Sequence, residues 1–220
     1  CFDDKRIVHA TLHVSLERAI ALITRERVTN VIAATHKTLM AMGISQPRVA
    51  VSGLNPHAGE HGMFGDEEID IIAPVILDAK NSGIDADGPF GADTMFHKPG
   101  YDAFVVMVHD QGHVAAKLLA TNRSAGMTIG SPILFSSVAH GSALDIAGKN
   151  QAKPDAVIEA VRRLTGAAAQ DPKLNAAAEL VADTAERAFA ARLFHYSAPL
   201  YSQLAELGRT ADSPQLAGRR

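Results

Sequence analysis

Three histidines stand where the sequence predicts that β-strands end. His13 closes the first predicted strand, His57 lies in the turn after the second, and His109 directly follows a later, wholly apolar one. Because ligands of open α/β sheets bind beyond the carboxyl ends of the strands, the three imidazoles are expected at one edge of a sheet. Three neutral imidazoles with an open coordination position can hold a divalent metal that activates a substrate. The spacing therefore predicts a metal site, although a single strand-end histidine is more often a structural residue.

Two carboxylates and a lysine near these histidines could move protons. Asp110 follows His109 directly, where a carboxylate can orient a metal-binding imidazole or accept a proton. Asp93 lies in Gly-Ala-Asp-Thr and is either a site residue or the polar residue of a turn or helix cap. Lys117 could donate a proton or bind an anion, but its position alone favours a solvated helix residue.

The other histidines carry weaker signals. His9 precedes His13 by four residues, so it should point to the same face of the strand but deeper in the fold, where a structural role is expected. Structural or surface roles are also expected for His36, His97 and His195.

The elements that would position these residues alternate between strands and helices. Strands are predicted at residues 6–13, 48–53, 103–108, 127–129 and 133–138. Helices are predicted at 16–24, 28–42, 66–82, 155–164, 174–191 and 197–207, with a turn at 87–93. The alternation indicates an α/β fold with a largely parallel or mixed sheet.

The composition argues against a nucleic-acid-binding or membrane-spanning protein. The chain has 220 residues with a formal net charge of −3, and no run of Lys or Arg marks a surface for nucleic acid. No apolar stretch is long enough to span a membrane, and a single cysteine, Cys1, fits a reducing cytoplasm. A cytoplasmic protein that acts on a small molecule is expected. Because the chain begins with Cys1 rather than Met, we also expect that an N-terminal part is missing.

A loop rich in glycine and small residues follows the last predicted strand. It has the sequence HGSALDIAGKNQAKP and spans residues 140–154. Such a loop lets backbone amides approach a nucleotide closely, but it lacks the GxGxxG pattern of a Rossmann site. The residues alone leave open a nucleotide-binding loop and an ordinary glycine-rich connection.

Four motifs follow one another along the chain: GLNPHAGE, GPFGADTMF, HDQG with its following lysine, and HGSALDIAGK. Together they resemble the 4-hydroxythreonine-4-phosphate dehydrogenase family of vitamin B6 synthesis, and the resemblance covers residues 6–164. It implies the two-domain α/β fold of isocitrate and isopropylmalate dehydrogenases, in which a homodimer completes each active-site cleft with its second subunit. Residues 1–167 would then be the metal- and NAD-binding region, and residues 168–220 a helical C-terminal extension.

The resemblance also implies a role for each motif residue. It implies an NAD-dependent enzyme that oxidises a secondary alcohol beside a carboxylated carbon, after which CO₂ is lost. His13, His57 and His109 match the ligands of a divalent metal such as zinc, cobalt or magnesium. Lys117 matches a substrate-binding lysine, and Asp93 and Asp110 match acidic residues of the site. The loop that wraps the adenosine of NAD would contain His140, Gly141, Ala143 and Asp145.

Two positions of the substrate site depart from the B6 enzymes. Gly126 and Phe135 stand near the places where those enzymes carry an asparagine and an arginine, and neither side chain can bind phosphate. His113 also stands where the B6 enzymes are usually apolar. The segments HDQGHVAAKLLA and LFSSVAHGSALDIAG resemble more closely the branch that oxidises the carboxylated cis-dihydrodiol of terephthalate, 1,2-dihydroxy-3,5-cyclohexadiene-1,4-dicarboxylate, whose ring could pack on Phe135. The alternatives are therefore the same chemistry on this unphosphorylated dihydrodiol, a truncated metal-binding module without catalysis, and a metal hydrolase.

Overall fold

A computed structural model describes residues 1–2, 5–120, 124–131, 135–138, 144–146, 149, 151, 156–157 and 159–161. Residue contacts divide the chain into two units, Cys1–Thr121 and Asn122–Arg220. The boundary expected at residue 167 lies outside the described residues. None of the described helices is both long enough and apolar enough to cross a lipid bilayer.

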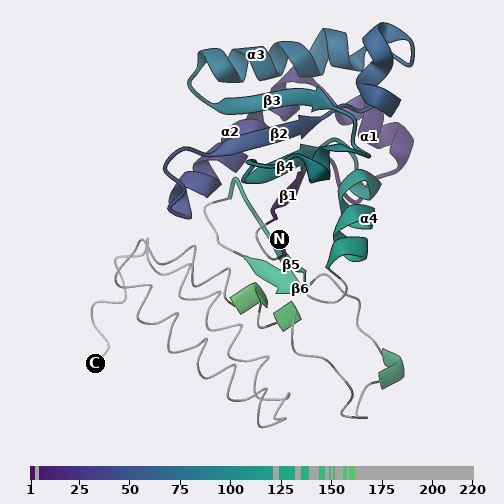
Figure 1. Cartoon of the computed structure of the whole chain (residues 1–220). Helices are drawn as coiled ribbons and strands as arrows, with labels where there is room; N and C mark the ends of the chain where they lie inside the picture. Colours follow the sequence, from purple (N-terminus) through teal and green to yellow (C-terminus); the bar gives the residue numbers. More distant parts are fainter. Residues whose placement is uncertain are drawn as a thin grey trace. The chain divides into compact units, whose positions relative to one another are not determined.

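The first unit is built on a four-stranded parallel sheet (Figure 1). The strands run in the order β1-β4-β2-β3, and every neighbouring pair is parallel. Their bounds are β1 Ile7–His9, β2 Arg48–Ser52, β3 Asp85–Phe90 and β4 Ala103–Val106. The predicted α/β class with a parallel sheet is confirmed.

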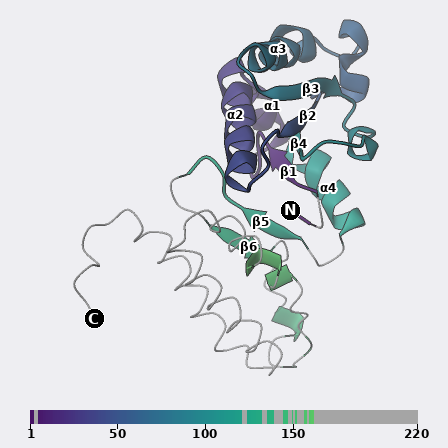
Figure 2. The same ribbon diagram turned by 60° about the vertical axis from the view of Figure 1, so that its left-hand side comes forward.

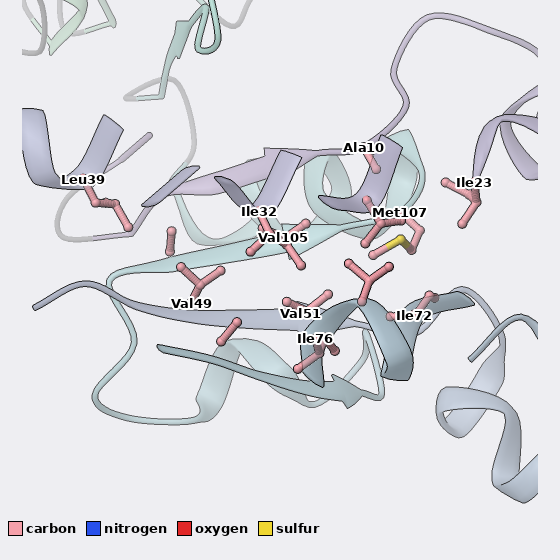
Figure 3. Packing of buried hydrophobic residues seen from close by; sticks show 14 residues of the cluster. Ala10, Ile23, Ile32, Leu39, Val49, Val51, Ile72, Ile76, Val105 and Met107 are labelled. Carbon is pink, nitrogen blue, oxygen red and sulfur yellow. The ribbon is translucent and has the colours of Figure 1, made fainter. Parts of the chain in front are cut away.

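Helices cover both faces of this sheet, which explains why its inner strand β4 is wholly apolar. All four residues of β4 are buried, and they alternate between two apolar clusters. Ala103 and Val105 pack with residues of α2 (Arg25–Ala41) and α3 (Ala73–Asn81), as Figure 3 shows for part of this cluster. Phe104 and Val106 pack on the other face, which α4 (His109–Leu119) covers. In Figure 2, α2 and α4 lie on opposite sides of the sheet.

Side-chain caps fix where the first helices begin. Ser15 accepts a hydrogen bond from the backbone N–H of Arg18 at the start of α1 (Leu16–Leu22). Thr24 does the same for α2 by accepting from the backbone N–H of Arg27, so α2 starts three residues before the predicted bound of 28. A single π-helical turn, Glu68–Ile72, leads directly into α3.

Two sequence predictions in this unit were wrong in detail. The first strand was expected to reach His13 but ends at His9, so His13 lies in the loop that follows. Residues 87–93 were predicted as a turn, yet residues 85–90 form β3 and only residues 92–93 of that stretch form a turn. The neighbouring strand overrides the local turn signal, because β3 pairs with β2 along most of its length.

The described part of the second unit contains one antiparallel hairpin. Its strands are β5 Ala125–Met127 and β6 Ser136–Val138, close to the predicted strands at 127–129 and 133–138. Residues 156–157 and 159–161 are helical, as predicted for 155–164. The helices predicted at 174–191 and 197–207 lie outside the described residues.

Candidate functional site

The carboxyl ends of three neighbouring parallel strands carry the predicted histidines. His13 follows β1, His109 begins α4 just after β4, and His57 lies in the turn Pro56–Gly62 after β2. Because β4 pairs with both β1 and β2 in parallel, these three segments leave the sheet at the same edge.

Gln111, in the first turn of α4, ties two of these strand ends together. Its carbonyl oxygen accepts hydrogen bonds from the backbone N–H groups of Met107 and Val108, at 2.9 and 3.1 Å. Its amide nitrogen donates to the carbonyl oxygens of Gly53 and Leu54, at 3.0 and 3.3 Å. Sequence reasoning missed this residue, although a glutamine at the third position of a helix is a known capping signal.

Gly112 allows α4 to lie directly against β1. A Cβ atom at this position would lie 2.7 Å from Cγ2 of Ile7 and would also collide with the imidazole of His9. Such a separation is far inside van der Waals contact, so only glycine fits here without a shift of the neighbouring chain. The glycine of the HDQG motif is thus explained by helix-to-strand packing.

Four histidines gather where α4 meets β1. Nδ1 of His113 lies 2.9 Å from Nε2 of His9, and these two ring centres are 4.5 Å apart. The ring of His113 also stacks on the ring of His109, with centres 4.1 Å apart and an interplanar angle of 1°. The ring of His13 lies 5.6 Å from that of His109. A structural role was expected for His9, and His113 was not among the predicted metal ligands.

Burial keeps the inner rings of this cluster neutral. Burial, followed by the charges of His113 and His109, lowers the pKa of His9 from 6.5 to about 3. The pKa of His113 is also lowered, first by burial and then by the charge of His109. Neutral imidazole is the form that binds metal ions, so the cluster is electrostatically suited to a cation.

Asp110 sets the tautomer of His109. Its Oδ1 lies 2.6 Å from Nδ1 of His109, while the carboxylate itself remains well exposed. A carboxylate only accepts, so Nδ1 carries the hydrogen and Nε2 presents its lone pair. This carboxylate–histidine arrangement is the one that orients metal-binding imidazoles in proteins.

Two of the three predicted metal ligands, His13 and His109, lie close together. Two imidazoles on one tetrahedral metal place their ring centres about 5 Å apart, given metal–nitrogen bonds of about 2 Å. The 5.6 Å between His13 and His109 matches this spacing. The ring of His57 instead lies 6.3 Å from the ring of Phe64. Across the part of the chain that the structure describes, no three His, Cys, Asp or Glu side chains are grouped to hold one ion.

His57 occupies a left-handed turn. The five residues from His57 to His61 all have positive φ, and only one of them is a glycine, Gly59. Left-handed backbone is costly for residues with a side chain, and such strain concentrates at functional sites. The turn follows directly from the carboxyl end of β2, so the strained segment lies at the sheet edge described above.

The buried carboxylate of Glu68 holds the chain that enters this turn. Its Oε1 accepts hydrogen bonds from the backbone N–H groups of Leu54 and Asn55, at 2.6 and 2.8 Å. Its Oε2 accepts from the side-chain amide of Asn55 at 3.0 Å. Sequence reasoning missed Glu68, because a buried carboxylate looks like any acid in the first turn of a helix.

The remaining predicted residues are spread along both units. Lys117 is exposed on α4, and because it follows His109 and His113 at intervals of four residues, the three share one face of the helix. Asp93 is exposed after β3. Gly126 lies in β5, and Phe135, which precedes β6, is 52% exposed.

The predicted NAD-binding loop is largely outside the described residues. That is where His140, Gly141 and Ala143 lie. Asp145 belongs to the short 3₁₀ helix Leu144–Ile146, of which the backbone at this position is described.

Known proteins show the same domain. The family model described as "Pyridoxal phosphate biosynthetic protein PdxA" matches residues 2–164. A Clostridium botulinum protein named "Putative D-threonate 4-phosphate dehydrogenase" is 45% identical over 159 residues, which cover 71% of this chain and 48% of that protein. The 1,2-dihydroxy-3,5-cyclohexadiene-1,4-dicarboxylate dehydrogenase of a Comamonas species is 42% identical and covers 72% of this chain and 50% of its own length.

Solved structures agree with this assignment. A 4-hydroxythreonine-4-phosphate dehydrogenase from Klebsiella pneumoniae superposes with a TM-score of 0.68 at 37% identity, over 76% of this chain and 52% of that one. A terephthalate 1,2-cis-dihydrodiol dehydrogenase from Burkholderia xenovorans LB400 gives 0.62 at 45% identity, over 72% and 52%. The chain spans about half the length of the relatives it matches. The resemblance first indicated by four short motifs is confirmed, and the chain belongs to the family of the pyridoxal phosphate biosynthetic protein PdxA.

Proposed function

We propose that this chain is the metal- and NAD-binding part of a decarboxylating dehydrogenase that oxidises a secondary alcohol beside a carboxylated carbon. The observation that carries the proposal is the pair His13 and His109, spaced for one metal ion, with Asp110 fixing the His109 tautomer. The names of the relatives, which are dehydrogenases of hydroxylated acids, support the same chemistry.

The proposed metal ligands are His13, His57 and His109. A bound zinc, cobalt or magnesium ion would act as a Lewis acid that makes the substrate hydroxyl more acidic and favours loss of CO₂ from the resulting β-keto acid. The chain's own contribution is to present imidazoles at one sheet edge. Asp110 contributes by keeping a hydrogen on Nδ1 of His109, so that Nε2 is available.

The proposed proton carriers are Lys117 and the two carboxylates Asp93 and Asp110. A bound NAD would supply the acceptor for the hydride of the carbinol carbon, and the hydroxyl proton would pass to a base on the chain. When the carboxylate then leaves as CO₂, a proton must be returned to the carbon that carried it. Lys117 is proposed as that donor or as an anion clamp, because it lies on the same face of α4 as His109.

The assembly proposed for the whole protein follows its family. Residues 1–167 would form the metal- and NAD-binding region of an isocitrate dehydrogenase-like fold, and residues 168–220 a helical extension. Adenosine would be held by the loop containing His140, Gly141, Ala143 and Asp145. A cytoplasmic homodimer would complete each cleft.

The preferred substrate is an unphosphorylated, carboxylated cis-dihydrodiol. Gly126 offers no side-chain hydrogen bond, and Phe135 offers an exposed aromatic ring rather than a phosphate-binding cation. Similarity to the Comamonas and Burkholderia enzymes supports this choice, whereas similarity to the Clostridium protein supports a phosphorylated one.

The test is NAD reduction by the full chain with added divalent metal, on the dicarboxylated dihydrodiol and on 4-phosphohydroxy-L-threonine in parallel. We expect reduced nicotinamide with the dihydrodiol, loss of the signal in His109→Ala, and an unchanged rate in the control His97→Ala, whose side chain is exposed outside the cluster. Turnover of the phosphate ester alone would reverse the substrate assignment. Metal binding without turnover of either compound would favour a non-catalytic module.

A further inference from the structure

The contact between His9 and His113 has no part in the proposed chemistry, yet both rings lie close to the ring of His109, with centres 6.3 and 4.1 Å from it. Nε2 of His9 and Nδ1 of His113 are 2.9 Å apart, and they join β1 to α4 across 104 residues of sequence. The contact therefore ties α4 to β1 through two side chains.

The ring of His109 is restrained in two directions. Its edge is hydrogen-bonded to Asp110 through Nδ1, at 2.6 Å. Its face lies flat against the ring of His113, 4.1 Å away and tilted by only 1°. The hydrogen bond limits rotation of the ring within its plane, and the stacked neighbour limits its tilt. Nε2, on the far edge of the ring, keeps a defined direction.

A purely structural role would not require histidine at both positions. An apolar side chain at position 9 could fill the same space, but it could not bind Nδ1 of His113. Two imidazoles can share one hydrogen bond, because one ring donates through its N–H while the other accepts at its bare nitrogen. The missing side chain at Gly112 leaves the room that the His9 ring occupies.

We propose that His9 and His113 are positioning residues that fix the imidazole of His109 in the orientation for binding a metal ion, an inference that rests on the proposed metal site. His113 acts by stacking on His109, and His9 acts by holding His113. The nitrogens that the two rings direct at each other, Nε2 of His9 and Nδ1 of His113, are engaged in their mutual contact.

The test measures metal affinity rather than turnover. Zn²⁺ and Co²⁺ are titrated calorimetrically into the full chain, into His9→Leu, His113→Leu and the double variant, and into the matched control His97→Leu. Each cluster variant should weaken binding about 10- to 100-fold, which is the usual effect of losing a group that orients a metal ligand. The double variant should lose no more than the worse single variant, because both act along one chain of contacts. The absorption bands of bound Co²⁺ should shift in the same variants.

Several outcomes would overturn the inference. If the wild-type chain binds metal and His109→Ala abolishes binding while His113→Leu does not weaken it, the positioning role is wrong and the metal site stands. If the wild-type chain binds no metal, or if the His109→Ala variant binds metal as tightly as the wild-type chain, the proposed metal centre is wrong. The inference about His9 and His113 is then wrong as well. Two controls separate loss of fold from loss of affinity. Thermal unfolding of the metal-free variants shows which of them are still folded.

If His9→Leu is unstable, His9→Gln, which keeps a hydrogen-bonding group, should bind metal more tightly than His9→Leu. No such recovery of affinity would count against the proposal.

Discussion

Nε2 of Gln111 lies 3.0 Å from the carbonyl oxygen of Gly53, so the first turn of α4 is bonded directly to the chain that leaves β2. The two residues are 58 positions apart in sequence. With its other bonds, this single side chain serves two N–H groups after β4 and two carbonyl groups after β2. The His109 and His57 segments are therefore coupled through one amide.

Replacing the side-chain amide of Gln111 should lower the stability of the fold. In Gln111→Leu, four backbone groups lose their partner, and each buried group left without one costs about 1–3 kcal/mol. We expect urea unfolding to show a loss of at least about 3 kcal/mol. The control Gln46→Leu removes the same side chain from an exposed site and should change little. A loss in Gln111→Leu no larger than in the control would show that water replaces these bonds.

Neutralising Glu68 should loosen the entry to the His57 turn. Both oxygens of Glu68 accept hydrogen bonds, so in Glu68→Gln the new NH₂ group must face a donor, either the two backbone N–H groups or the Asn55 amide. We therefore expect a loss of about 1–3 kcal/mol in unfolding free energy. Glu67→Gln is the matched control, because its carboxylate accepts one bond from Asn55 and is less buried. Equal losses in the two variants would contradict the special role of the buried carboxylate.

Sequence patterns predicted the sheet well because its strands are either continuous apolar runs or short β-branched segments. They failed at β3, where Gly88 and Pro89 resemble a turn and only pairing with β2 reveals a strand. They also did not predict the contact between His9 and His113, which joins residues 104 positions apart. The strand-end rule placed three histidines at one edge, but the rotamers that bring His13 within reach of His109 depend on packing that no local pattern contains.

The left-handed turn predicts opposite effects at neighbouring positions. Gly59 has a φ of 80°, and a Cβ there would lie 2.7 Å from Oε2 of Glu68, so Gly59→Ala should destabilise by more than about 1 kcal/mol. Glu60 has a φ of 42° and is exposed, so Glu60→Gly should relieve strain and be neutral or stabilising by up to about 1 kcal/mol. Thermal and urea unfolding of both variants provide the measurement. Destabilisation by Glu60→Gly would argue that this residue is not left-handed in solution.

The buried imidazole of His9 predicts a loss of stability in acid. Its pKa is lowered from 6.5 to about 3 by burial, so between these values the unfolded chain binds a proton that the folded chain does not. The free energy of unfolding should therefore be full above pH 6.5 and should fall toward pH 3, with a slope of at most about 1.4 kcal/mol per pH unit from this group. Urea unfolding across this range should show a shallower slope in His9→Leu than in wild type or His97→Leu. Identical slopes would mean that His9 is not buried in solution.

The turn from His57 to His61 has a consequence for chirality. Over these five residues the backbone has the hand that a chain of D-amino acids would choose. D-Alanine placed at position 58 by chemical synthesis should enter the turn without the steric penalty that L-alanine bears. Mirror-image residues, which disrupt ordinary helices and strands, would here reinforce the native shape beside His57.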